Sequence, residues 1–159
     1  KLLAQALEIS PDNPVVRNEM VAMLTVSAQA LRKAGELDEA ARQFQTAAQL
    51  DPDDFWSLYY LIELGMRSGQ QEYARQVLEH AMALYPDSPM MLGQQAKFAF
   101  TLGDRRKAFD LMKRALEIQP NSRSLWNDLL TLSAAANDQI LAMHAQEKID
   151  QITAFIEGR

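Results

Sequence analysis

Small, helix-breaking and apolar residues recur in this chain every 34 residues, and this spacing constrains the fold more than any other feature. Five columns of the repeat can be read directly from the sequence. They are Gly35, Gly69, Gly103 and then Asn137; Ala40, Ala74, Ala108 and Ala142; Ala47, Ala81 and Ala115; Pro52, Pro86 and Pro120; and Leu24, Leu58, Leu92 and Trp126. A period of this length indicates one supersecondary unit copied along the chain, whose copies stack to share a core.

Each column has a physical reason within a helix–turn–helix unit. Glycine takes the left-handed conformation without Cβ strain where one helix must end and another begin, and asparagine is the next-best residue there. The alanines are small enough for two antiparallel helices to approach closely, and columns seven residues apart lie on one helix face. The prolines end the second helix, because a proline inside a helix costs roughly 3 kcal/mol.

N-cap residues predict where the first helix of each unit begins. The candidates are Asn13 before Pro14, Asp53 or Asp54, Ser88 before Pro89, and Ser122. Short polar side chains of this kind accept hydrogen bonds from the first free backbone N–H groups of a helix, and proline is favoured at the first helical position.

A 34-residue unit with these glycine, alanine and proline positions resembles the tetratricopeptide repeat (TPR). The family's W-x2-L-G-x2-Y pattern is only partly met, for example by Trp126 and Leu129. The resemblance implies one all-α TPR domain over 1–159, built as a right-handed superhelical solenoid of antiparallel helix pairs. The expected parts are 1–11, the end of a preceding repeat; 12–54, 55–88 and 89–122, three repeats; and 123–156, a last repeat with a capping helix.

The repeat that contains the first full glycine turn is longer than the others. Pro11 and Pro52 are 41 residues apart, seven more than the period. Seven residues add two helical turns with only about 20° of drift, so the buried face keeps its direction. We therefore expect one long helix over 13–34 that overhangs its neighbours. Its extra turns are either a longer cap or an added contact surface for a partner or a second copy.

Both ends of the chain carry expectations of their own. The chain opens at Lys1 within a helical pattern, so we interpret it as a fragment of a longer protein. Leu2, Leu3 and Leu7 belong to a second helix whose first helix is missing, so this end either continues upstream or is covered by self-association. The last four residues, 156–159, match the recognition sequence of factor Xa and are either an added cleavage site or a natural helix tail.

Composition argues against several function classes, although it leaves a local basic patch open. The net charge is −5, whereas nucleic acids and anionic membranes require a basic face. There is no cysteine, so disulfides, thiolate nucleophiles and cysteine-bound zinc are absent. No apolar run approaches the roughly 20 residues that span a bilayer. A cysteine-free chain fits the cytosol or a bacterial periplasm equally.

The sequence offers no catalytic, cofactor or metal motif. His80 and His144 lie on different predicted helices without a second ligand at metal-binding spacing, which favours a surface or packing role. The acidic cluster at 51–54 lacks the glycine of a calcium loop, and the basic run at 105–107 is too short for nucleic acid. We therefore expect no enzymatic activity and no bound cofactor or metal.

The resemblance implies that the first helices line a groove that binds a peptide or helix of another protein. The candidate groove residues are Trp56, Tyr59, Tyr60, Glu63 and Arg67; Met90, Gln94 and Lys97; Asn127 and Asp128; and, on the long helix, Asn18, Ala22, Thr25, Gln29 and Arg32. At least two of the aromatic residues Trp56, Tyr59 and Tyr60 are expected to be exposed as binding anchors. Arg67 and Lys97 are expected to pair with acidic groups of the ligand.

Two functions follow as hypotheses. The first is a protein–protein interaction scaffold of a bacterial-type assembly factor. The second is a structural spacer or dimerisation module attached to a separate functional domain.

One TPR subgroup grips a terminal carboxylate with a Lys/Asn/Arg clamp, but this chain departs from that pattern. The corresponding residues here are Thr25, Gln29, Tyr60, Met90 and Gln94, so the chaperone-tail clamp is missing.

Overall fold

The computed structural model describes residues 13–158, and all regular structure within that range is α-helical. The helices in this range are α2 (Pro14–Ala34), α3 (Leu37–Leu50), α4 (Phe55–Arg67), α5 (Gln71–Leu84), α6 (Pro89–Thr101), α7 (Arg105–Ile118), α8 (Arg123–Ala135) and α9 (Gln139–Ile156). The expectation of an all-α chain is confirmed. The expectations for residues 1–11 and for Arg159 lie outside the described residues.

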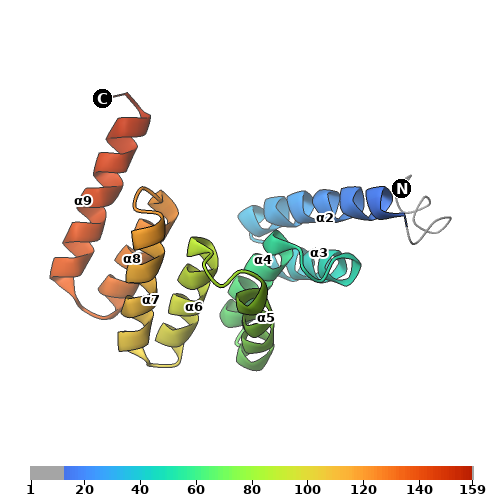
Figure 1. The fold of residues 1–159 in the computed structure, drawn as a ribbon, viewed down its shortest axis with the longest axis horizontal. Helices are drawn as coiled ribbons and strands as arrows, with labels where there is room; N and C mark the ends of the chain where they lie inside the picture. The colour runs from blue at the N-terminus through green and yellow to red at the C-terminus, as the bar shows by residue number, and fades with distance from the viewer. Residues whose placement is uncertain (1–12, 159) are drawn as a thin grey trace. The chain divides into compact units, whose positions relative to one another are not determined.

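The helices form antiparallel pairs, α2 with α3, α4 with α5, α6 with α7 and α8 with α9 (Figure 1). The chain divides into two compact units, with the boundary between Leu84 and Tyr85. In the first unit, α3 also packs against α4. In the second unit, α8 packs against both α6 and α7. Each unit therefore contains two stacked helix pairs.

The turns inside the pairs are chemically equivalent. The residue after each turn glycine donates its backbone N–H to a carbonyl five residues earlier, as in Glu36 to Leu31 at 3.0 Å and Gln70 to Gly65 at 2.9 Å. The glycine column takes positive φ at each such turn, and Asn137 does so at φ 59° in the last pair. This is the Schellman geometry that the glycine column predicts.

The predicted N-caps are confirmed. Asn13 accepts from the backbone N–H groups of Val15 and Val16, at 3.0 and 3.4 Å. Asp54, not Asp53, caps α4, through a 2.7 Å bond from the Ser57 N–H. Ser88 and Ser122 cap α6 and α8 in the same way. The second helices α3, α5 and α7 end two residues before the proline column, at Leu50, Leu84 and Ile118.

Small residues lie where paired helices approach closest. The alanines of the two predicted columns at 40, 47, 74, 81, 108 and 115 are completely buried. A further small column is visible in the structure at Gly65, Ala99 and Ser133, again 34 residues apart. A β-carbon on Gly65 would lie 3.1 Å from the Ala74 side chain, which shows how closely α4 and α5 are packed.

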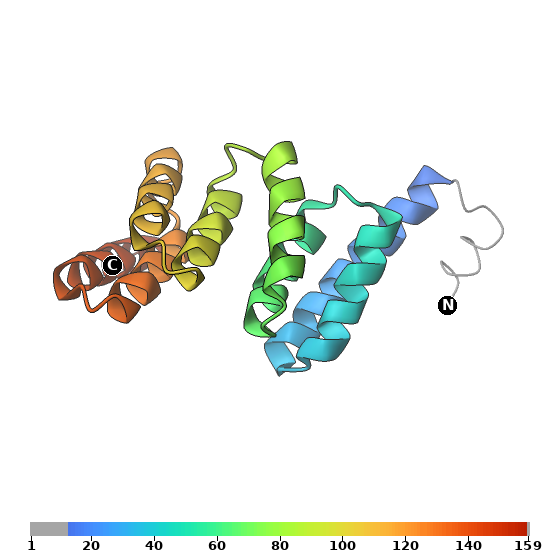
Figure 2. The same ribbon diagram turned by 90° about the horizontal axis from the view of Figure 1, so that it is seen from below.

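The helix α2 is one uninterrupted helix of 21 residues, whereas α4 has 13. Its N-terminal turns extend past the end of α3, as both views of the ribbon show (Figure 2). The first buried side chain along α2 is Val21, so the early turns contribute little to the core.

The last helix, α9, exposes both polar and apolar side chains. Its exposed side chains include polar residues such as Glu147 and Gln151, but also four large apolar residues. The exposed apolar residues are Ile140, Met143, Phe155 and Ile156. No helix among residues 13–158 is long and apolar enough to cross a membrane.

Candidate functional site

The predicted groove residues lie on the first helices of the pairs, α2 and α4 in the first unit and α6 and α8 in the second. We call the side-chain set Arg32, Trp56, Tyr60, Glu63 and Arg67 the aromatic–arginine patch. It lies wholly within the first unit, and four of its five members lie on one face of α4. Residues 56, 60, 63 and 67 share that face because they follow helical spacing.

The aromatic residues of α4 are not equally available. Trp56 exposes 41% of its surface, whereas Tyr59 and Tyr60 each expose 9%. The expectation that at least two of the three are exposed is therefore wrong. Tyr60 stacks on Phe44 of α3, with ring centroids 4.8 Å apart, and Tyr59 packs edge-on against Tyr60. Helical spacing places Tyr60 on the correct face of α4, but α3 covers that side chain.

Trp56 is exposed and at the same time held in place. Its ring stacks on Tyr60 at a centroid distance of 6.0 Å and meets Tyr59 edge-on at the same distance. The neighbouring Phe55 also contacts it edge-on, at 5.2 Å. A large aromatic side chain that is already immobilised loses little conformational entropy when it is covered by a ligand.

Glu63 joins two arginines beside this aromatic cluster. Its carboxylate lies 3.2 Å from Arg32 of α2 and 3.6 Å from Arg67 of α4. The Arg32 guanidinium also lies 4.8 Å from the Tyr60 ring centroid, a cation–π arrangement. Arg67 keeps 55% of its side chain exposed. Two guanidinium groups share one carboxylate, so the patch carries a net positive charge.

The predicted residues of the second unit form a different, more neutral surface. Lys97 of α6 pairs with Asp128 of α8 at 3.3 Å, so the cation already has an acidic partner within the unit. Gln94 is completely buried, which contradicts its expected place in the groove. Asn127 is exposed and donates to the Arg123 carbonyl at 2.8 Å, and Met90 is partly exposed.

On the long helix, the expected groove residues also divide. Thr25 is buried and bonds the Ala22 carbonyl at 3.0 Å, so it belongs to the core rather than to an open surface. Arg32 contributes directly to the aromatic–arginine patch. Asn18 and Ala22 are exposed, and Gln29 is partly exposed.

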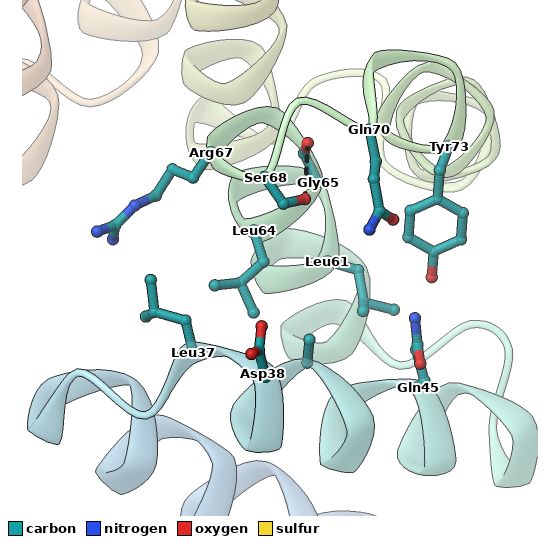
Figure 3. Close-up of a pocket in the computed structure, with 11 residues that line it drawn as sticks. Leu37, Asp38, Gln45, Leu61, Leu64, Gly65, Arg67, Ser68, Gln70 and Tyr73 are labelled. Carbon is teal, nitrogen blue, oxygen red and sulfur yellow. Dashed lines mark hydrogen bonds between the residues drawn. The ribbon is translucent and has the colours of Figure 1, made fainter.

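A pocket of about 370 Å³ lies on another side of α4, between α3 and α5 (Figure 3). Leu37, Leu61 and Leu64 contribute to its apolar part, and Gln45, Gln70 and Tyr73 lie along one side. Burial raises the pKa of Tyr73, and a hydrogen bond with Gln45 opposes that shift. The Tyr73 phenol is therefore neutral and serves as a hydrogen-bonding group. The repeat columns do not predict this pocket, because its lining residues come from α3, α4, α5 and the α4–α5 turn and meet only when these helices pack.

The two histidines have packing roles. His80 Nε2 lies 3.2 Å from the Pro52 carbonyl oxygen and 3.1 Å from the Asp53 carboxylate, which links α5 to the α3–α4 loop. His144 packs edge-on against Trp126 at a centroid distance of 5.6 Å. Among residues 13–158, no group of three or more His, Cys, Asp or Glu side chains could hold a metal ion.

The family comparison agrees with the repeat geometry. Residues 31–98 match the family model described as "Tetratricopeptide repeat". This part of the chain is therefore similar to tetratricopeptide repeats. The matched stretch begins at the end of α2 and reaches into α6, so it includes the turns at Gly35 and Gly69. No curated protein sequence matches the chain at a significant level.

Solved TPR structures share the fold at low sequence identity. TTC0263, a thermophilic TPR protein of Thermus thermophilus, is 21% identical with a TM-score of 0.69, covering 93% of this chain and 78% of that one. The MamA RS-1 ArsTM double mutant is 17% identical with a TM-score of 0.65, covering 99% and 84%. The first TPR of Spaghetti (RPAP3), bound to the HSP90 peptide SRMEEVD, is 21% identical with a TM-score of 0.62, covering 75% and 94%.

Proposed function

We propose that this TPR chain is a protein-interaction scaffold without catalytic activity, and that it binds a peptide or helical segment of a partner at the aromatic–arginine patch. The observation that carries the proposal is Trp56, an exposed aromatic side chain that two tyrosines hold in place. Tryptophan and arginine are among the residue types that most often dominate the energy of protein interfaces.

The charge of the patch indicates which partner chemistry it suits. Arg67 is exposed, and the carboxylate that it faces is also engaged by Arg32. A partner segment with an acidic side chain would therefore add a second carboxylate to a site with two guanidinium groups. An apolar or aromatic partner residue would cover Trp56. The partner segment that fits is thus an amphipathic one, with an acidic residue close to its apolar anchor.

Structural similarity supports the binding mode only in general terms. A TPR domain with the same fold holds the peptide SRMEEVD. The proposal does not extend to chaperone tails, because the residues here at the clamp positions include the buried Thr25, Tyr60 and Gln94. None of these is a cation that could grip a terminal carboxylate.

The first experiment identifies the partner and its contact point together. A photo-crosslinking amino acid replaces Trp56 in the purified chain, the chain is irradiated in native lysate, and mass spectrometry identifies the captured peptide. The captured segment is then synthesised and titrated against a Trp126→Phe variant, in which Trp56 is the only tryptophan and its fluorescence reports binding.

Two paired variants test whether the patch carries the binding energy. The Trp56→Ala, Arg67→Glu variant alters two exposed side chains of the patch. The control, Ile118→Ala with Lys113→Glu, makes a similar apolar and charge change on the exposed surface of α7. We expect the patch variant to bind at least about 30-fold more weakly, since a hot-spot residue contributes about 2 kcal/mol or more. Equal affinity of all three proteins rejects the patch as a binding site.

A further inference from the structure

The outward side of α2 carries apolar residues that no described part of the chain covers. We call the set Val15, Glu19, Ala22, Val26, Ala30 and Lys33 the α2 stripe. Its members are spaced by three or four residues and therefore run along one side of the helix. Val15 exposes 65% and Val26 68% of its surface, and the other four are also exposed.

The α2 stripe is distinct from the side of α2 that packs within the unit. Val21, Thr25 and Ala28 are the buried residues of α2, and they lie on the other side of the helix axis. Arg32, which belongs to the aromatic–arginine patch, lies about 120° around the axis from Val26. A protein that covers the α2 stripe therefore leaves Arg32 and its contacts in place.

Five of the six members of the α2 stripe lie at positions that are symmetric about Val26. Ala22 and Ala30 lie four residues before and after it, and Glu19 and Lys33 lie seven residues before and after it. Seven residues correspond to about 10 Å along the helix. Neither Glu19 nor Lys33 takes part in an ion pair within residues 13–158, and both side chains are exposed there.

We propose that the α2 stripe is the interface of a homodimer in which α2 pairs antiparallel with α2 of a second copy, with the two-fold axis beside Val26. In this arrangement Val26 meets Val26, each Ala22 meets Ala30 of the other copy, and each Glu19 meets Lys33. A two-fold interface requires this kind of self-complementary patch.

The charges of Glu19 and Lys33 favour a second copy of the chain as the binding partner, and they favour the antiparallel direction of its α2. A parallel pair would bring Glu19 to Glu19 and Lys33 to Lys33, and like charges brought together weaken association. The alanines on both sides of Val26 let the helices approach closely, and the extra turns of α2 bring Val15 into the same stripe. The dimer uses a surface separate from the one proposed to bind a partner, so each proposal can fail without the other.

A charge-exchange experiment tests the pairing. The dimerisation of the 159-residue chain is measured by analytical ultracentrifugation, with circular dichroism to verify folding. Lys33→Glu and Glu19→Lys each replace two attractive pairs by two repulsive ones, and we expect each to weaken dimerisation about tenfold. The double variant restores opposite charges and is expected to restore the native dimerisation constant. Even a weak dimer with a micromolar Kd would form at about 100 µM, so a native chain that stays monomeric at this concentration overturns the proposal. A double variant that dimerises as weakly as the single variants also overturns it.

A cysteine cross-link tests the position of the axis. The chain contains no cysteine, so one introduced thiol reports a single distance without interference. Val26→Cys places two thiols side by side at the axis, and we expect a disulfide-linked dimer under mild oxidation. Glu36→Cys is the control, because it lies just past the C-terminal ends of the two α2 helices, which this arrangement separates by about 24 Å. Equal cross-linking of the two variants, or none at Val26→Cys, rejects the antiparallel register.

Discussion

Arg32 of α2 lies with its guanidinium carbon 4.8 Å from the ring centroid of Tyr60, a side chain on α4 that also stacks on Phe44 of α3. Tyr60 thus connects three helices of the first unit, and its ring is a structural element beneath the exposed Trp56. This arrangement separates residues that hold the patch together from residues that a partner can reach.

Tyr60→Ala is expected to lower the free energy of unfolding by about 3–4 kcal/mol, because it removes a buried ring between helices. Trp56→Ala is expected to cost less than about 1.5 kcal/mol, since much of its ring already faces water. Urea denaturation followed by circular dichroism measures both. Tyr60→Phe keeps the ring and serves as the control, with a stability near that of the native chain. If Tyr60→Ala is as stable as Trp56→Ala, Tyr60 is not the structural element beneath Trp56.

Gly65→Ala and Gly93→Ala are expected to have different effects on stability. A β-carbon at 65 would meet the side chain and backbone of Ala74 at 3.1 and 3.4 Å, whereas one at 93 would meet the end of the Leu125 side chain at 3.0 Å. Leucine can rotate away, but the backbone of α5 cannot without separating the helices. We expect Gly65→Ala to lose about 1–3 kcal/mol and Gly93→Ala to lie within about 1 kcal/mol of native.

The same comparison can be made by thermal unfolding, with far-UV circular dichroism as the signal. Both substitutions improve intrinsic helix propensity by a similar amount, so the difference between them isolates the packing term. Equal melting temperatures for the two variants would show that α4 and α5 can separate more easily than their spacing indicates.

Ser57→Ala is expected to stabilise the chain. The Ser57 hydroxyl is completely buried and has no hydrogen-bond partner among the described residues. Removing an unpaired buried hydroxyl avoids its desolvation cost, and alanine also favours the helix, so we expect a gain of about 1 kcal/mol. The readout is the midpoint of urea unfolding. Ser133→Ala is the comparison, because Ser133 is equally buried but bonds the Leu129 carbonyl at 2.7 Å, and it should show no such gain.

Asn137→Gly is expected to stabilise the last helix pair by about 0.5–1 kcal/mol, because Asn137 has the left-handed conformation that glycine occupies at the equivalent turns. Gly103→Ala introduces a β-carbon at a left-handed residue and is expected to lower the free energy of unfolding by about 1 kcal/mol or more. There φ is 85°, and no neighbouring atom crowds the new β-carbon. Hydrogen exchange at the backbone amides of α8 and α9 measures the first effect locally.

The helices, their caps and their turns could be predicted from the sequence because they depend on local chemistry. Gly35 and Asn137 stand at their turns for a conformational reason that acts within a few residues. Ser88 and Asp54 cap helices through hydrogen bonds that span three residues. These interactions need no knowledge of which helix lies next to which.

The exposure of the site could not be predicted in the same way. Spacing along α4 shows that Trp56 and Tyr60 share a face, but it does not show that Phe44 and Arg32 cover Tyr60 while Trp56 stays open. Gln94 has the same limitation in α6, where a polar residue that was expected on the surface is completely buried. Exposure depends on neighbouring helices that are distant in the sequence.

The contact of His80 with the α3–α4 loop determines where the ring carries its hydrogen. Nε2 faces the Pro52 carbonyl oxygen and the Asp53 carboxylate, and both of these groups only accept hydrogen bonds. The neutral ring must therefore be the Nε2–H tautomer, which leaves the lone pair on Nδ1. Any proton or electrophile that reaches this imidazole without opening the contact has to add at Nδ1, and the ¹⁵N chemical shifts of the two ring nitrogens would differ accordingly.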